Sequence, residues 1–346
     1  FTAELGARFD RHTLLGESFV SPRLNLAFAP GTNTVLRAGW GIFRQSHRPY
    51  ELQVEDGQTG FAEAERGEHV YLGFEHVVGG EGRLAGLAFR AEAYRRETDN
   101  PRVRFENLFE PFNTFPELEP DRVEIRPQRG RGQGIELFLR GPRRGRLAWW
   151  VNYAYASSED RIGSRWVPRK VDQPHTLNLD LEVALGKRWR LNAAWKLRSG
   201  WPTTQLTLVE IPPEPGGDPG DPGGGEEGGS SGEPEDGDEG DGSSGMEEPG
   251  GTDDPGDMEE GPEILAVLGP LNSRRLPTYH RLDLRLSREL KVRRGRLTLF
   301  FEAQNAYNRN NLSGFDVVFD DDLGQLVITD EFWPGIVPSL GLTWEL

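Results

Sequence analysis

No cysteine occurs among the 346 residues of the chain, and this absence excludes disulfide bonds and thiol chemistry. No run of about 18 apolar residues occurs either, so the sequence predicts no membrane-spanning helix. Methionine is nearly absent, with only Met246 and Met258, and the chain begins at Phe1 inside a segment of alternating apolar and polar residues. Because no signal peptide precedes this segment, we expect a fragment or a processed product.

Basic residues are missing from one long tract. The formal net charge of −16 comes from residues 210–263, which hold 20 acidic residues and no basic ones. The rest of the chain has 36 acidic residues against 40 Lys and Arg, so its balance gives no reason to expect a nucleic-acid partner. The Gly, Pro and acidic content of the tract predicts a disordered loop insert. Its clustered carboxylates could collect Ca²⁺, but they lack the spacing of a dedicated site.

Motifs of enzymes and metal sites are also missing. The six histidines show no metal-ligand spacing, and His69 and His76 would lie on opposite faces of one strand. The sequence contains no Gly-x-Ser-x-Gly motif, no phosphate-binding loop and no catalytic triad. We therefore expect no enzymatic activity, no metal site and no bound cofactor.

Strict alternation of apolar and polar residues is the main pattern that is present. In the segment 280–311, Leu282, Leu284 and Leu286 alternate with polar residues, and the same period returns after a tight basic turn. A period of two indicates strands, and two such runs around a short turn indicate an antiparallel hairpin. The pattern predicts twelve strands, with apolar residues alternating over 3–9, 24–28, 36–42, 70–74, 87–93, 135–139, 147–155, 177–183, 189–197, 282–286, 297–303 and 340–346.

The connections between these runs predict the fold class. Turns of roughly two to six residues alternate with loops of about fifteen or more, as in outer-membrane β-barrels, whose strands are about ten residues long. A soluble β-sandwich also alternates, but here the predicted apolar face holds no charge in mid-strand, and the strands exceed the usual five or six residues. Aromatic residues near strand ends suit the two membrane interfaces: Trp40, Trp149, Tyr153, Tyr155, Trp189, Trp195 and Trp344.

Several short segments resemble one family of outer-membrane proteins. They are Ser21-Pro22-Arg23-Leu24, Ala64-Glu65-Arg66-Gly67-Glu68-His69 followed by Gly73-Phe74-Glu75-His76, Gly132-Gln133-Gly134-Ile135-Glu136-Leu137, Asp172-Gln173-Pro174-His175-Thr176-Leu177-Asn178, Ser199-Gly200-Trp201-Pro202 and Asn305-Ala306-Tyr307-Asn308. In their order and spacing they resemble the C-terminal half of the barrel of TonB-dependent receptors. The resemblance covers nearly the whole chain apart from the acidic tract.

This resemblance implies an all-β fold, a transmembrane antiparallel meander in which the twelve strands are the last of 22. Residues 1–346 would be a partial barrel, and 210–263 an extracellular insert. The N-terminal plug, which engages TonB, would be absent. The implied function is TonB-energised uptake of a scarce nutrient, such as a ferric siderophore, cobalamin or an oligosaccharide, through the bacterial outer membrane. The implied partners are the TonB complex, the lipid bilayer and the barrel assembly machinery, for which Leu346 replaces the usual terminal aromatic residue.

The resemblance also orients the chain. Both ends would be periplasmic, and the loops 47–66, 98–128, 157–173, 199–279 and 306–337 would face outside. Cations on the polar side of the strands would line the lumen and bind an anionic ligand, or else pair with the plug or with Asp180, Glu182, Asp283 and Glu302. Aromatic residues of the loop 105–115 would touch the ligand or pack within the loop. The resulting candidate ligand-binding residues are Arg37, Arg90, Arg190, Lys196, Arg198, Phe109 and Phe112.

Two other functions stay open at this point. A plug-free, porin-like channel would close the twelve strands into a complete cylinder. An adhesin would use the long loops to bind a host surface. The pairing of the first strand with the last strand distinguishes the channel from the receptor, because a larger barrel leaves both edges unpaired here.

Overall fold

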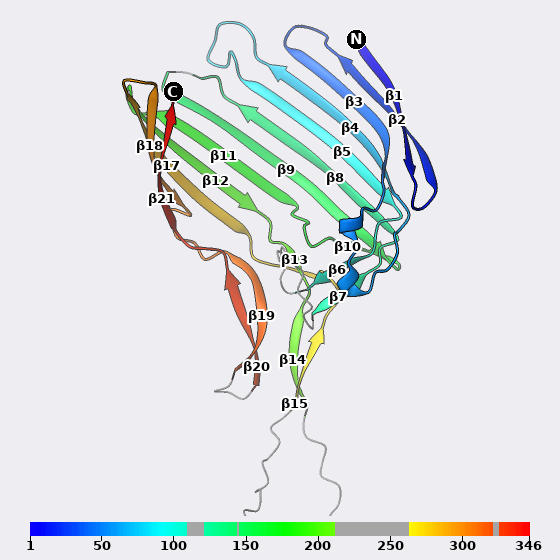
Figure 1. Ribbon diagram of the computed structural model, residues 1–346. Coiled ribbons are helices and arrows are strands. Elements are labelled where there is room, and N and C mark those ends of the chain that lie inside the picture. The colour runs from blue at the N-terminus through cyan, green and yellow to red at the C-terminus, as the bar shows by residue number, and fades with distance from the viewer. Residues whose placement is uncertain (109–120, 144, 212–262, 321–324) are drawn as a thin grey trace, which may run out of the picture. The chain divides into compact units, whose positions relative to one another are not determined.

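The computed structural model describes residues 1–108, 121–143, 145–211, 263–320 and 325–346. The chain divides into two units, one formed by residues 1–206 and 268–346 and the other by residues 207–267. The first unit contains one large antiparallel sheet, whose strands run side by side in chain order (Figure 1). Its twelve main strands are β1 (Thr2–His12), β2 (Glu17–Phe28), β3 (Thr34–Gln45), β4 (Glu65–Val77), β5 (Ala88–Asp99), β8 (Arg129–Arg140), β9 (Leu147–Ile162), β11 (His175–Ala184), β12 (Trp189–Arg198), β17 (Tyr279–Lys291), β18 (Arg296–Gln304) and β21 (Val337–Glu345).

The register of these strands gathers the apolar residues on one face. Leu5 lies opposite Leu24, and Leu24 lies opposite Trp40 on the other side of β2. At the far edge, Leu299 lies opposite Leu342. Because successive side chains of a strand point to opposite faces, this register forms one continuous apolar face and one polar face. The twelve strands therefore match the twelve that the alternation predicts.

The apolar face is not covered by another layer. Leu72 is 61% exposed and Ile135 is 50% exposed, although both lie in the interior of the sheet. Within the described residues, the buried apolar side chains are those of Ala64, Leu108, Ile125, Trp201 and Leu276, and all five lie in connections between the main strands. Water-soluble monomers rarely expose so large an apolar surface. The soluble sandwich is therefore excluded, and the apolar face requires lipid.

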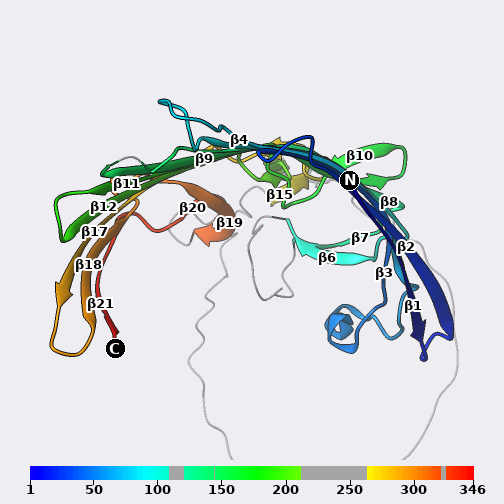
Figure 2. The same cartoon turned by 90° about the horizontal axis from the view of Figure 1, so that it is seen from above.

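Among the described residues, the sheet has two free edges. β1 pairs with β2 and β21 pairs with β18, and these two strands stand at opposite ends of the strand order. Seen from above in Figure 2, the sheet is curved, and the β6–β7 hairpin lies on its concave side. Because β1 and β21 do not pair with each other, the closed twelve-stranded cylinder of a porin-like channel is not observed.

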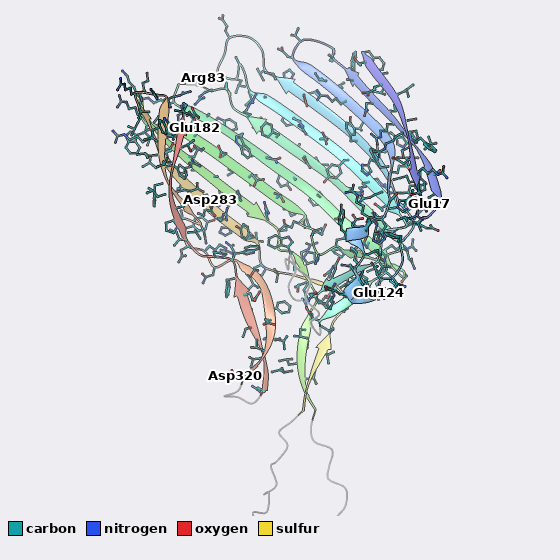
Figure 3. All side chains as sticks on the ribbon, viewed as in Figure 1. Glu17, Arg83, Glu124, Glu182, Asp283 and Asp320 are labelled. Carbon is teal, nitrogen blue, oxygen red and sulfur yellow. The ribbon has the colours of Figure 1, made fainter. Side chains whose placement is uncertain are left out.

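Turns and loops lie at opposite ends of the sheet, as the sequence predicts. In Figure 3, Arg83 and Glu182 lie near the end with the tight turns, which we call the turn end. Glu17 and Glu124 lie near the other end, which we call the loop end. Two expectations about the connections are wrong. The first connection at the loop end spans only residues 13–16, and β9 continues to Ile162 and turns back through β10 (Arg165–Pro168) instead of entering a loop at residue 157.

Short elements fill the long connections at the loop end. Two single-turn 3-10 helices, η1 (Pro49–Glu51) and η2 (Val54–Asp56), follow β3. A hairpin of β6 (Arg104–Asn107) and β7 (Arg122–Ile125) follows β5, and β13 (Pro202–Thr203) pairs with β16 (Arg274–Arg275). The connection after β18 contains a hairpin of β19 (Leu312–Asp320) and β20 (Gln325–Phe332).

The second unit contains little that the structure describes. β14 (Leu206–Ile211) pairs with β15 (Glu263–Leu268), and these two strands flank the acidic tract. Residues 212–262 lie outside the described residues, so the disordered insert stays a prediction.

Glycines on the polar face make room for aromatic rings. Gly39 lies opposite Tyr71, and a Cβ atom on Gly39 would be 2.1 Å from Tyr71 Cε1. The ring of Tyr71 therefore lies over the glycine, a packing that compensates for the missing side chain in a strand.

We expect Gly39→Val to lower the free energy of unfolding by about 1–3 kcal/mol, because the new side chain must displace the ring. Urea unfolding followed by loss of heat-modifiable electrophoretic mobility measures this change. Gly6→Val is the matched control, since Gly6 also lies on the polar face and a Cβ atom added to it would have no atom within 4 Å. Equal loss of stability in both variants would contradict the role of the Tyr71 ring.

Candidate functional site: the polar hollow at the loop end

The polar face carries a hollow near the loop end of the sheet. Its volume is about 640 Å³, and its lining includes Tyr71, Glu92, Tyr94, Arg96 and Thr176. A second hollow of about 820 Å³ adjoins it and extends beneath the connection that follows β3. His69, Arg96 and Thr98 line both hollows, so we treat them together as the loop-end hollow.

Backbone register places the two tyrosines at the centre of this surface. Tyr71 of β4 lies opposite Tyr94 of β5, and their other neighbours are Gly39 and Gly134. A Cβ atom on Gly134 would be 2.8 Å from the Tyr94 hydroxyl oxygen, so each ring lies over a glycine of the adjoining strand. The glycines therefore hold the phenol groups close to the wall.

Arg96 supplies positive charge between the two parts of the hollow. Arg96 is exposed, and no ion pair joins its side chain to another residue in the described part of the chain. His69 lies beside it, half-buried, with its ring 4.5 Å from that of Phe43. The imidazole Nε2 of His69 is buried without a hydrogen-bond partner among the described residues. The surface can therefore attract an anion and donate hydrogen bonds from guanidinium and phenol groups.

Buried carboxylates fix the connections that border the hollow. Asp160 of β9, which is 2% exposed, accepts hydrogen bonds from Arg104 of β6 and from Arg169 after β10. Asp172, which is 4% exposed, pairs with Arg275 and accepts the backbone N–H of Ser158. Because buried carboxylates are stable only when they are paired, these contacts define the positions of the loops.

A further pair of contacts holds the connection between β3 and β4. Arg122 of β7 donates two hydrogen bonds to the Asp56 carboxylate, and both side chains are almost fully buried. Arg102 donates to Glu51 over 2.6 Å and also to the carbonyl oxygen atoms of Gln45 and Ser46. Arg102 and Arg122 thus attach the β3–β4 connection, which borders the loop-end hollow, to the β5–β8 connection.

The pKa of Glu51 reflects this environment. Burial raises it, but the backbone N–H of Arg48 and the guanidinium of Arg102 lower it further, so the pKa lies below the ordinary 4.5. Since the pKa is depressed in the folded state, the charged carboxylate stabilises the connection above the unfolded pKa. This contribution is lost as the pH falls through the lowered folded value.

Acidification below the ordinary pKa of 4.5 and through the lowered pKa of Glu51 should therefore increase the mobility of a spin label placed at Glu63 in the same connection. Glu51→Gln should raise the mobility at neutral pH and remove most of its pH dependence. Glu55→Gln is the control, because Glu55 is an exposed carboxylate of the same connection. Identical behaviour of the two variants would show that the Glu51 contacts do not hold the connection.

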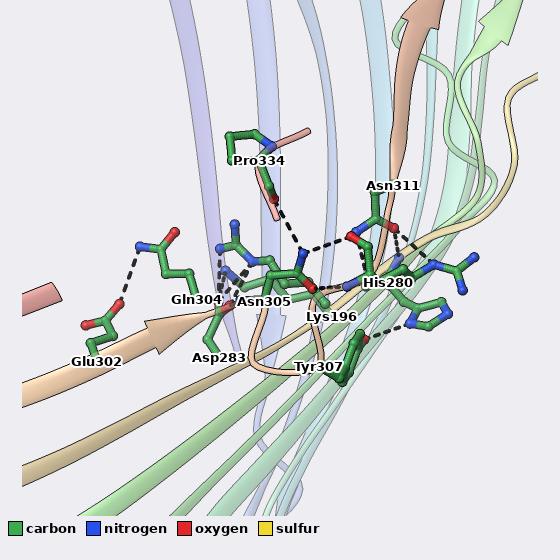
Figure 4. A network of polar contacts seen from close by, with 11 residues as sticks. Lys196, His280, Asp283, Glu302, Gln304, Asn305, Tyr307, Asn311 and Pro334 are labelled. Atoms are coloured by element: carbon green, nitrogen blue, oxygen red, sulfur yellow. Dashed lines mark hydrogen bonds and ion pairs between the residues drawn. The ribbon is translucent and has the colours of Figure 1, made fainter. Parts of the chain in front are cut away.

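The motif Asn305-Ala306-Tyr307-Asn308 forms a polar network where β18 ends (Figure 4). Asn305 is 1% exposed and has a positive φ of 50°, and its side chain bonds to the backbone N–H and C=O of Arg309. Its own N–H donates to Asp283, which also pairs with Lys196 at 3.7 Å. Tyr307 shares a hydrogen bond of 2.7 Å with His280. These hydrogen bonds therefore fix the backbone where β18 ends and the following loop begins.

The candidate cations from the sequence lie on the polar face, and most have partners. Arg37 pairs with Glu75, Arg90 with Glu92 and Arg190 with Glu289. Of the four carboxylates expected as partners, Asp283 binds Lys196, whereas Glu182 and Glu302 pair with Arg143 and Arg285. Arg198 has a buried Nε without a hydrogen-bond partner among the described residues. None of these five cations lines the loop-end hollow, and their role in ligand binding stays a prediction.

Other residues form the hollow, and the sequence reasoning missed them. Tyr71, Tyr94 and Arg96 occupy polar positions of the predicted strands, and this parity was the only signal that could have found them. Phe109 and Phe112 lie outside the described residues, so the aromatic loop stays a prediction as well. No group of three or more His, Asp or Glu with metal-binding geometry occurs in the part of the chain that the structure describes.

No helix among the described residues is long and apolar enough to span a membrane. A meander of long strands with an exposed apolar face, a polar face and loops gathered at one end defines the wall of a transmembrane β-barrel. The family model described as "TonB dependent receptor-like, beta-barrel" matches residues 1–306. The chain therefore belongs to the TonB-dependent receptor-like β-barrel family, and it is located in the bacterial outer membrane.

Solved structures have the same fold. A variant of the ferric enterobactin receptor PfeA from Pseudomonas aeruginosa is 15% identical with a TM-score of 0.54, over 99% of this chain and 42% of that one. The copper transporter OprC is 12% identical with a TM-score of 0.54, over 94% of this chain and 39% of that one. The ferripyoverdine receptor of Pseudomonas aeruginosa is 9% identical with a TM-score of 0.50, over 94% and 33%. No curated protein sequence matches the chain.

This chain spans less than half the length of each of these relatives. At such low identity, the comparison with these structures concerns the fold of the barrel wall alone.

Proposed function

We propose that the chain forms part of an outer-membrane receptor that imports a scarce nutrient with energy delivered through TonB. The observation that carries the proposal is the combination of two faces on one sheet. One face is apolar, with exposed large apolar side chains on ten of the twelve strands, and the other carries a hollow of guanidinium and phenol groups beside loops that buried ion pairs fix in place. This arrangement suits capture of a polar solute at the loop end of a membrane wall.

The hollow favours an anionic ligand. Arg96 is an exposed cation without an ion-pair partner among the described residues, and Tyr71 and Tyr94 add hydrogen-bonding groups and ring surfaces. Of the three nutrient classes that the family suggests, anionic ferric siderophores fit this chemistry best. TonB, a plug segment and the barrel assembly machinery are the proposed protein partners, and no enzymatic step is proposed.

Uptake measurements in the native bacterium test this function. Cells with the gene deleted and complemented cells are starved for iron, and each receives ⁵⁵Fe-loaded siderophores, ⁵⁷Co-labelled cobalamin or labelled oligosaccharides. We expect complementation to restore saturable uptake of one class, and a protonophore to abolish it. Uptake that is unsaturable and unaffected by the protonophore would contradict the proposal and favour a passive channel.

Within that assay, Arg96→Gln should weaken ligand binding about tenfold, because it removes a charge-assisted contact. Arg126→Gln is the matched control, since Arg126 is exposed near the loop end but does not line the hollow. If both variants bind the ligand as the parent does, the hollow is not where the ligand binds.

A further inference from the structure

Three neighbouring turns at the turn end are unusually basic. They are the turns β8–β9, β11–β12 and β17–β18, which lie beside one another because β9 pairs with β11 and β12 pairs with β17. Backbone hydrogen bonds connect them, from Ala184 N–H to the carbonyl of Arg146 and from Glu289 N–H to the carbonyl of Arg188. We call the following exposed residues the turn-end basic cluster: Arg143, Arg146, Lys187, Arg188, Lys291, Arg293 and Arg294.

Few acidic residues balance this charge. Three carboxylates lie close to the cluster, those of Glu182, Glu289 and Glu345, and each is already paired. Glu182 binds Arg143, and the other two bind Arg296. Among the described residues, the other six members of the cluster have no ion-pair partner, so the three turns together carry a strong local positive charge.

The charge is specific to this part of the sheet. The other two connections at the same end, residues 29–33 and 78–87, contain only one basic residue, Arg83, and one acidic residue, Glu81. A general requirement of tight turns therefore does not explain the cluster.

The cluster adjoins the lipid-facing surface. Trp189 and Trp344 belong to the apolar face at this end, and they are 39% and 58% exposed. Arg288 lies over the Trp189 ring at 5.1 Å, and the Trp344 indole N–H donates to the carbonyl of Arg294 at 2.8 Å. Tryptophans of this kind mark the level of the lipid headgroups, so the unpaired cations lie at or just beyond that level.

We propose that the turn-end basic cluster binds the phosphate groups of anionic phospholipids in the leaflet beside the turns. The positive charge complements phosphodiester groups, and guanidinium groups bind phosphate through two parallel hydrogen bonds. The cluster is also continuous with the face that contacts the acyl chains. A lipid needs both surfaces, whereas a soluble acidic protein would need only the charged one. Bound lipid would anchor this side of the barrel at a fixed depth.

Lipid retention by the whole protein, purified from outer membranes, tests this inference. The protein is placed in nanodiscs of phosphatidylethanolamine with phosphatidylglycerol, and native mass spectrometry counts the lipids that stay bound. We expect a preference for phosphatidylglycerol that falls about tenfold in the triple variant Arg188→Gln, Arg293→Gln, Arg294→Gln, and that weakens at high ionic strength.

The control removes the same charge elsewhere. The triple variant Arg126→Gln, Arg161→Gln, Arg165→Gln replaces three exposed arginines near the loop end, and its preference should stay within about twofold of the parent protein. An unchanged preference in the turn-end variant would overturn the inference and leave an acidic protein as the partner. An equal loss in both variants would also overturn it, because net charge and not the cluster would then control retention. Nutrient uptake is not part of this readout, so its outcome is independent of the proposed transport function.

Discussion

Val151→Arg is expected to destabilise the folded barrel by about 2–4 kcal/mol, the cost of an arginine on the lipid face near the bilayer midplane. Val151 lies in β9, between Leu139 and Leu179, which are its cross-strand neighbours on the apolar face. The arginine must either leave its charge in hydrocarbon or distort the strand to reach water. Urea unfolding in lipid vesicles, followed by tryptophan fluorescence, measures the change.

Asn152→Arg is the matched control for this variant. Asn152 is the next residue of the same strand, and it lies on the polar face between Phe138 and Asn178. We expect a change of less than about 1 kcal/mol, because the side chain points away from lipid. If the two variants lost the same stability, the assignment of lipid to the apolar face would be wrong.

Arg122→Ala should have the second large effect, a local one. It would leave the Asp56 carboxylate buried and unpaired, a situation that costs about 3–5 kcal/mol. Because Asp56 belongs to the β3–β4 connection and Arg122 to β7, the cost should appear as opening of the contact between these two segments. Hydrogen exchange of residues 49–60 should accelerate by at least about a hundredfold, whereas exchange in β9 should not change.

Two controls separate the buried charge from a general loss of arginine. Arg126→Ala removes a nearby arginine that is 73% exposed and should leave exchange unchanged. The double variant Asp56→Asn, Arg122→Gln removes both charges and should recover most of the protection. Acceleration in Arg126→Ala equal to that in Arg122→Ala would refute the account of this contact.

The sequence was sufficient to predict the strands of the wall, but it did not show where they end. Lipid on one side and water on the other impose alternation between Leu177 and Val183, for example, and that pattern can be read directly. Beyond the lipid boundary the backbone ladder continues without any need for apolar residues. For this reason β1 continues to His12, β2 begins already at Glu17, and β9 continues to Ile162. These extensions consist of polar residues that alternation alone assigned to loops.

The loop-end hollow was predictable only in part. Parity places Tyr71, Tyr94 and Arg96 on the polar face, but it does not reveal their depth or the loops above them. Those loops are fixed by ion pairs between residues distant in sequence, such as Arg122 and Asp56, which are 66 positions apart. Any of the many arginines could pair with any nearby carboxylate, so the choice depends on the folded backbone.

The central claim is that one face of this sheet contacts lipid and the other contacts water. Since the chain has no cysteine, single cysteines can be introduced along β11 at successive positions from Thr176 to Val183 and spin-labelled in the reconstituted protein. Accessibility to oxygen should peak at Leu177, Leu179 and Leu181, and accessibility to a water-soluble nickel chelate should peak at the residues between them. Accessibility without a period of two, or nickel contact at the leucines, would contradict the account.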